Sequence, residues 1–275
     1  FKKMKNENDI ITLIESSIKK GNNNIKLFTL NLLSEIKKII SIEDLKAIIE
    51  KRLSQKNIYF IRHAEAKHNI LEKKYKGNFS KCNIYDPDLT RNGINQTKKT
   101  IEKIKNEKVL YDGIFISPLR RTIQTYFLVK DHVDTNKNTQ IIITDFLREI
   151  LSSYDKNKGI KLSILKNELK EENLNFEYIT KEYWWYDLGQ LTQNELEGHQ
   201  RFHLRLRLFI LWLIFRVEKN MIIISHSHVF SALQNHAIRN ADFVKMNNKI
   251  LFEKILELLC YNDLSSIIFE KKKKK

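Results

Sequence analysis

The chain has 275 residues, which is enough for one large domain or two small ones with a sizeable hydrophobic core. Its formal net charge of +16 comes mainly from lysines scattered along the whole length. The sequence contains no basic strip interleaved with aromatic residues, which would be typical of a nucleic-acid-binding motif. We therefore expect no specific nucleic-acid partner. The all-lysine segment 271–275 is expected to be a solvated tail with at most a weak attraction to polyanions or anionic lipid.

Cysteine usage and hydropathy indicate a cytoplasmic protein. Cys82 and Cys260 have no neighbouring ligand pattern, so the sequence predicts neither a disulfide framework nor a zinc site. The longest apolar run, residues 208–215, is too short to cross a bilayer and is flanked by Arg207 and Arg216. We expect it to be a buried helix face, with no transmembrane segment.

Residues 1–56 are expected to be helical. Apolar residues recur at helical spacing in residues 10–18 and 25–40, and Ser41 with Asp44 forms a capping box for a third helix. No residue pattern that carries chemistry is visible in these helices. We interpret them as an N-terminal extension that packs on the main domain or mediates contacts outside it.

From residue 57 to 270 the sequence alternates between strand and helix patterns. The four apolar runs typical of buried strands are 58–61, 113–116, 141–143 and 221–224. The expected helices are 90–108 with Thr90 as N-cap, one with Ser117 as N-cap and Pro118 as its first residue, 192–219 with a Thr192–Glu195 capping box, and one from residue 229. Residues 62–87 are expected to be irregular. This alternation predicts an α/β fold: a three-layer α/β/α sandwich with a mostly parallel central sheet.

Ionisable or polar residues follow every one of these strands. They are Arg62 and His63, Ser117 with Arg121, Glu149, and Ser225 with His226. Because ligands bind at the carboxyl ends of the strands in open α/β sheets, we expect these side chains to meet at one edge.

The chemistry of this set indicates a site for a phosphoryl group. The planar guanidinium group of arginine can donate two hydrogen bonds to a pair of phosphate oxygens, and it stays charged at any working pH. A histidine such as His63 in that setting can attack phosphorus and form phosphohistidine, while His226 stabilises the transferring group. Glu149 can protonate the leaving oxygen and then accept a proton from water. The cationic side chains take the place of a metal ion, so no metal or cofactor is expected.

Several motifs are similar in order and spacing to those of the histidine phosphatase superfamily, also called phosphoglycerate mutase-like, over about residues 57–240. They are Arg62-His63-Ala64-Glu65 with Asn69, Leu89-Thr90 with Gly93, Ser117-Pro118-Leu119 with Arg121, Gln124 and Thr125, and Ser225-His226-Ser227. The chain resembles most the plant and protist phosphoglycerate mutase-like phosphatases, through Leu147-Arg148-Glu149, Asp155-Lys156, Trp184-Trp185 and Trp212.

The resemblance implies a role for each residue of the site. His63 is the nucleophile, Arg62, Arg121 and His226 bind the phosphate, Glu149 is the general acid and base, and Asn69 touches the phosphate or the substrate. Ala64 and Ser227 stand where many members have glycine, but neither change removes a reacting group. We therefore expect an active, metal-independent enzyme.

Other polar residues are expected at the rim or outside the site. Lys156 and Lys158 are candidate contacts to an acidic substrate, together with Ser227. The remaining histidines are interpreted as surface or packing residues, with a rim position open to one of them, His228; the others are His68, His199, His203 and His236.

Hydrolysis of a phosphomonoester is the favoured reaction. Mutases of this superfamily carry a longer characteristic sequence after the catalytic glutamate, and residues 147–151 lack it. Phosphoglycerate mutase-type transfer remains an alternative, as does a non-catalytic phospho-ligand-binding or scaffold role. The substrate could be a phosphorylated small molecule or a phosphoprotein, and the sequence does not specify it or the oligomeric state.

Overall fold

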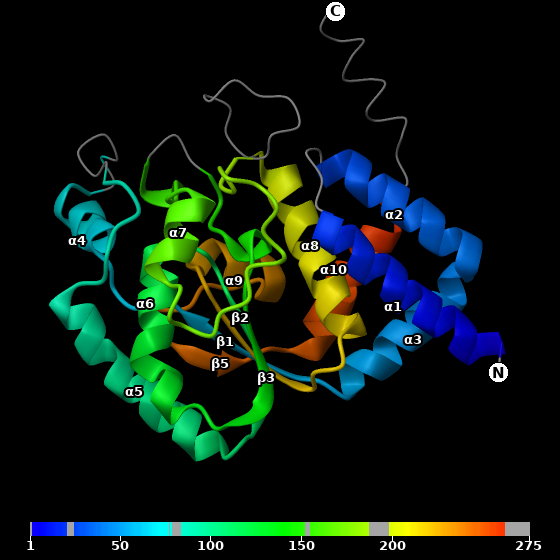
Figure 1. Cartoon of the computed structure of the whole chain (residues 1–275), viewed down its shortest axis with the longest axis horizontal. Coiled ribbons are helices and arrows are strands. Elements are labelled where there is room, and N and C mark those ends of the chain that lie inside the picture. Colours follow the sequence, from blue (N-terminus) through cyan, green and yellow to red (C-terminus); the bar gives the residue numbers. More distant parts are fainter. Residues whose placement is uncertain are drawn as a thin grey trace, which may run out of the picture.

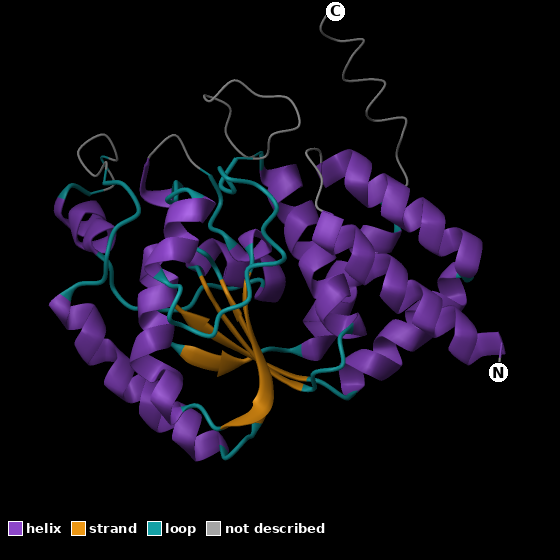
Figure 2. Cartoon of the chain, viewed as in Figure 1, coloured by secondary structure: helices purple, strands orange, loops and turns teal. Residues whose placement is uncertain are grey.

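A computed structural model describes residues 2–20, 25–76, 78, 84–151, 155–186 and 198–261. Its centre is a five-stranded sheet of order β3-β2-β4-β1-β5 (Figures 1 and 2). The strands are β1 (Asn57–Arg62), β2 (Tyr111–Ile116), β3 (Thr135–Ile143), β4 (Asn220–Ser225) and β5 (Phe243–Lys245). β5 alone in this sheet pairs antiparallel, along β1, so the expected mostly parallel sheet is confirmed.

Helices cover both faces of the sheet, as the expected three-layer sandwich requires. Along β1, Phe60 joins one core cluster while its neighbour Ile61 joins the other, because successive side chains of a strand point to opposite faces. Figure 1 shows α5, α6 and α7 on one side of the sheet and α8 and α10 on the other. The helices of the main domain are α4 (Lys67–Lys74), α5 (Arg91–Glu107), α6 (Arg120–Val129), α7 (Leu162–Glu168), α8 (His199–Phe215), α9 (Ser227–Gln234) and α10 (Asn248–Leu259), and the short 3₁₀ turns are η2 (Lys130–His132), η3 (Asp145–Leu147) and η4 (Asp155–Asn157).

The N-terminal helices share the core of the main domain. They are α1 (Lys2–Lys20), α2 (Ile25–Ile39) and α3 (Ile42–Ser54), and they lie beside α8 and α10 in Figure 1. Ile10 and Ile14 of α1 belong to the same buried cluster as Trp212 of α8. Ser41 caps α3 as predicted, because its hydroxyl accepts a hydrogen bond from the Asp44 N–H at 3.1 Å.

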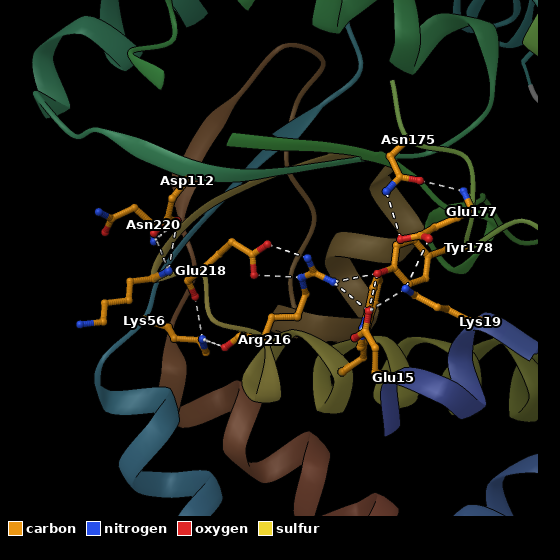
Figure 3. Close-up of polar contacts among 12 residues, drawn as sticks. Glu15, Lys19, Lys56, Asp112, Asn175, Glu177, Tyr178, Arg216, Glu218 and Asn220 are labelled. Carbon is orange, nitrogen blue, oxygen red and sulfur yellow. Dashed lines mark hydrogen bonds and ion pairs between the residues drawn. The ribbon is translucent and has the colours of Figure 1, made fainter. Parts of the chain in front are cut away.

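A partly buried network of charges links α1 to the end of α8 (Figure 3). Arg216 donates two hydrogen bonds to the Glu218 carboxylate, at 2.6 and 2.9 Å, and one to the Tyr178 hydroxyl at 3.2 Å. Glu15 of α1 lies 3.6 Å from the Arg216 guanidinium and accepts a hydrogen bond from the Trp212 indole at 2.8 Å. Arg216 is already paired with Glu218, so Glu15 adds a second carboxylate to this guanidinium and contributes to holding α1 against α8.

Three local predictions are wrong. The helix expected over 192–219 begins only at His199, after the extended N-cap Gly198, and ends at Phe215. The other two errors have a physical cause. α6 begins at Arg120 rather than at Pro118, because the Ser117 hydroxyl lies 2.8 Å from the His226 ring and does not cap the helix; the Arg120 N–H instead donates to Asp86 at 3.0 Å. Residues 62–87 are not irregular throughout, since they contain α4. Its buried residues are His68 and Asn69, so no apolar stripe marked it in the sequence.

Some predictions fall outside the described residues: the Thr192–Glu195 capping box, the environment of Cys82 and the lysine tail at 271–275. Within the described part of the chain, no helix is both long and apolar enough to cross a bilayer.

We predict that Ile14→Ala lowers the free energy of unfolding by about 2–5 kcal/mol, because Ile14 is buried in the shared core and its truncation leaves a cavity. Urea denaturation of the full chain measures the change. Thr12→Ala, at an exposed position of the same helix, is the matched control and should stay within about 0.5 kcal/mol of the wild type. Equal effects of the two changes would show that α1 does not contribute to the core.

Candidate functional site

The register of two neighbouring parallel strands places two histidines side by side. Arg62, the last residue of β1, is paired with Ser225, the last residue of β4. His63 and His226 follow directly, and their ring centroids lie 5.2 Å apart. The two predicted histidines therefore share one buried site at the carboxyl end of the sheet.

His63 has one nitrogen fixed and one available. Nδ1 lies 2.8 Å from the carbonyl oxygen of Ala64, which can only accept a hydrogen bond, so Nδ1 carries the proton and Nε2 has the lone pair. Burial, followed by the charges of Arg121 and Arg62, holds the pKa of His63 well below its usual value. The side chain is 2% exposed. His63 is thus a neutral imidazole with a free Nε2 among cations.

His226 is fully buried, and its ring is held by a hydroxyl. Nε2 lies 2.8 Å from Ser117 Oγ, while Nδ1 is buried and has no hydrogen-bond partner among the described residues. Burial, with the charge of Arg121 next, keeps the pKa of His226 far below its ordinary value. A neutral His226 whose Nε2 accepts from Ser117 therefore presents an unused Nδ1–H.

Arg121 is buried and Arg62 is half-buried, and each keeps an N–H with no partner among the described residues. Arg121 donates through Nη1 to the Lys156 carbonyl at 2.8 Å and through Nη2 to Asn157 Oδ1 at 2.9 Å. Arg62 donates through Nη1 to the Ile238 carbonyl at 2.8 Å. The Nε atoms of both arginines are buried with no partner among the described residues. Burial lowers the pKa of Arg121 to about 10, so it remains charged at neutral pH.

Glu149 is paired with a histidine that the sequence placed at the surface or the rim. Its Oε1 accepts a hydrogen bond from the Ile150 N–H at 2.9 Å, and its Oε2 lies 3.1 Å from His228 Nδ1. Burial raises the pKa of Glu149, but the hydrogen bond and charge of His228, the Ile150 N–H and Arg121 outweigh it, and the net shift is downward. The same hydrogen bond raises the pKa of His228, whose side chain is 70% exposed at the rim. The raised pKa of His228 and the lowered pKa of Glu149 both favour a charged pair in which His228 Nδ1–H donates to the carboxylate.

Two residues that sequence reasoning missed hold the Glu149 segment in place. Arg205 of α8 is buried and donates to the carbonyls of Phe146 and Arg148, the latter at 3.0 Å. An arginine in the middle of an apolar helix was the available signal. Asn157 donates to the Ile150 carbonyl at 2.8 Å while it accepts from Arg121, and nothing in its sequence context indicated this bridge.

The opening motif also contains residues that support the site without reaching it. The Glu65 carboxylate accepts hydrogen bonds from Thr90 at 2.8 Å and Asn92 at 3.1 Å, which anchors the start of α5. A Cβ on Gly93 would lie 2.2 Å from the Glu65 carbonyl oxygen, so only glycine fits there. Ala64 is fully buried, and its N–H donates to Thr125 Oγ1 at 3.0 Å.

The remaining predicted residues lie near the histidines with other partners. Asn69 accepts from the Ala66 N–H at 3.0 Å, and its Nδ2 faces His68 Nε2 at 3.0 Å. Asn240 donates both to the His63 carbonyl at 3.0 Å and to Asn69 Oδ1 at 3.3 Å, and it links the two. Of the proposed substrate contacts, Lys156 lies on η4 in an ion pair with Glu72, Lys158 follows partly buried, and Ser227 begins α9.

Residues 58–251 match the family model described as the histidine phosphatase superfamily (branch 1). A search of curated proteins found no match. Similar solved structures include a putative alpha-ribazole-5'-P phosphatase from Escherichia coli K-12, at 19% identity over 68% of this chain and 88% of that chain, with a TM-score of 0.43. The ecdysone phosphate phosphatase from Bombix mori is 15% identical over 70% of this chain and 90% of its own, with a TM-score of 0.48. A phosphoglycerate mutase from Thermus thermophilus is 16% identical over 69% of this chain and 91% of its own, with a TM-score of 0.40.

We predict that His228→Asn raises the pKa of Glu149. The change removes the cation that favours the ionised carboxylate, while the burial that disfavours it remains. Titration of the ¹³C-labelled glutamate carboxyl by NMR measures the shift. His236→Asn, at an exposed histidine that has no contact with Glu149 among the interactions of the described residues, is the control and should leave that titration unchanged. A Glu149 pKa that did not move in His228→Asn would contradict the ion pair.

Proposed function

The chain belongs to the histidine phosphatase superfamily, and from this premise we propose that it hydrolyses a phosphomonoester through a covalent phosphohistidine on His63. The observation that carries the proposal is the state of the His63 ring. Its proton is held on Nδ1 by the Ala64 carbonyl, which leaves the Nε2 lone pair free beside the charges of Arg121 and Arg62. A free imidazole nitrogen among phosphate-binding cations is suited to attack phosphorus.

In the first step, Arg62 and Arg121 bind the phosphoryl oxygens through N–H groups that have no partner in the described structure. His63 Nε2 attacks phosphorus, the N–P bond forms and the ester P–O bond breaks. The electron pair of that bond goes to the leaving oxygen, which takes a proton from Glu149. Because the pKa of Glu149 is lowered and that of His228 is raised, His228 supplies this proton to Glu149 through their hydrogen bond.

In the second step, water attacks the phosphohistidine and Glu149 takes a proton from it. The N–P bond breaks, its electron pair returns to His63 Nε2, and inorganic phosphate leaves. His226 supports both steps if the Ser117 hydroxyl donates to its Nε2, because its Nδ1–H then points at the charge on the transferring group.

Hydrolysis is proposed over mutase-type transfer because residues 147–151 lack the longer sequence that mutases carry after the glutamate. We place the chain with the plant and protist phosphatases of the superfamily on the motifs around Glu149, Asp155-Lys156 and Trp184-Trp185 alone. The proposed enzyme is metal-independent and cytoplasmic. Transfer between phosphoglycerate positions faster than phosphate release would favour the mutase instead.

A phosphorylated small molecule or a phosphoprotein is the proposed substrate. Asn69 and the rim residues Lys156, Lys158 and Ser227 are proposed to contact it. In the present structure Lys156 is neutralised by Glu72, so an acidic substrate would have to compete with that ion pair. A phosphate-release screen over sugar phosphates, phosphoglycerates, nucleotides and phosphopeptides identifies the class.

We predict that His63→Ala lowers phosphate release from p-nitrophenyl phosphate by at least about a thousandfold, because no other group replaces the nucleophile. Enzyme that is denatured in alkali during turnover should carry base-stable, acid-labile phosphate in the wild type and none in His63→Ala. His236→Ala is the control, since that histidine is exposed and should keep full turnover. Wild-type protein that releases no phosphate from any substrate of the screen would instead support the scaffold role.

We also predict that the effect of Glu149→Gln depends on the leaving group. An alkoxide leaving group needs a proton and p-nitrophenolate does not, so turnover of glycerol phosphate should fall by about 10²–10⁴-fold and that of p-nitrophenyl phosphate much less. Steady-state kinetics with both substrates measures the difference. An equal loss on the two would show that Glu149 does not act as the general acid.

A further inference from the structure

A third histidine lies in the site, on α4. His68 is 6% exposed, and its ring centroid lies 5.6 Å from that of His63. Its Nδ1 is buried and has no hydrogen-bond partner among the described residues. Buried polar atoms of side chains nearly always have a hydrogen-bond partner. We therefore expect a bound ligand to supply the partner of this nitrogen.

The neighbouring asparagine determines which nitrogen of His68 carries the proton. The Ala66 N–H can only donate, so the Asn69 atom that it meets at 3.0 Å is the carbonyl oxygen. The amide nitrogen of Asn69 therefore faces His68 and donates to Nε2 at 3.0 Å. Because Nε2 accepts, a neutral His68 must carry its proton on Nδ1, and the unpartnered atom is a hydrogen-bond donor.

The surroundings keep His68 neutral. Burial first, and then the positive charges around it, lower its pKa far below the ordinary value for histidine. The charged groups are Arg121 from α6, Lys156 from η4 and Arg62 at the end of β1, while the neighbouring His63 disfavours a second protonated imidazole. A neutral imidazole in this place adds a directed N–H without adding another charge to a cationic site.

We propose that His68 donates its Nδ1–H to an oxygen of the phosphoryl group that His63 accepts, as a further ligand of that group. The inference rests on the proposed function, because the phosphoryl group is what brings an oxygen to this nitrogen. During transfer, negative charge is spread over the oxygens of the phosphoryl group. Each preorganised hydrogen-bond donor to one of these oxygens lowers the barrier. Asn69 then acts as the positioning residue that fixes the tautomer of His68.

The contact persists in the phosphoenzyme, because the phosphoryl oxygens stay in the site after the leaving group departs. His68 should therefore contribute to binding of phosphate-like anions as well as to turnover. A packing residue would contribute to neither beyond its effect on folding. Orthovanadate, which needs no leaving group, is thus the suitable probe.

Two substitutions distinguish the contribution of the N–H donor of His68 from that of its aromatic ring. His68→Phe keeps an aromatic ring and removes the N–H, whereas His68→Gln keeps an N–H donor. We expect His68→Phe to weaken orthovanadate inhibition by about ten- to a hundredfold and to lower kcat by about 10²–10³-fold. His68→Gln should recover part of both losses. His236→Phe is the matched control at an exposed position, and thermal unfolding of each variant checks that it folds.

A measurement on the unmodified protein gives a second test. ¹⁵N NMR of labelled histidine should show His68 as the Nδ1–H tautomer, without titration between pH 5 and pH 8 in the free protein. An Nε2–H tautomer, a His68 that titrates like a free histidine, or orthovanadate inhibition of folded His68→Phe equal to that of the wild type would each overturn the inference. A wild-type protein that neither releases phosphate nor binds orthovanadate would instead overturn the proposed function.

Discussion

The parallel pairing of β1 with β4 is the constraint on which the site depends. Because Arg62 is paired with Ser225, β1 and β4 end at the same level of the sheet. The residues that follow them, His63 and His226, are therefore neighbours. A shift of one residue would turn one histidine to the other face of the sheet. The apolar side chains of both strands are buried on both faces, which makes such a shift costly.

Around the two histidines, burial and positive charge act together. Ionised arginines are expensive to bury, and Arg62 and Arg121 are compensated only in part, by carbonyl oxygens and by nearby carboxylates. Burial first, and then the charge of Arg121, lower the pKa of His63 and of His226 and keep both neutral. A site of this kind is completed by an anion, which is paired with the charges and supplies acceptors for the unused N–H groups.

The sequence predicted the parts of this arrangement that depend on local pattern. Apolar runs that end in charged residues marked the strand ends, so the meeting of His63, Arg121 and His226 at one edge could be predicted. Hydrogen-bond partners that come from distant loops could not be predicted in this way. Ser117 fits an N-cap in sequence but meets His226 instead, and Asn157 reaches Arg121 from a segment with no pattern of its own. His68 was missed because α4 buries polar residues and shows no apolar stripe.

The packing of α1 in the core limits how far the protein can be truncated. The family-matching segment ends at residue 251, inside α10, and begins after all three N-terminal helices. α8 is buried almost all round, and part of what covers it is α1 and α2, with Glu15 next to Arg216. A fragment limited to residues 58–251 would present that helix to water as an apolar face and leave a buried arginine short of one carboxylate. We therefore expect the folding unit of this chain to be larger than the segment that matches the family model, because its α8 needs the additional helices as cover.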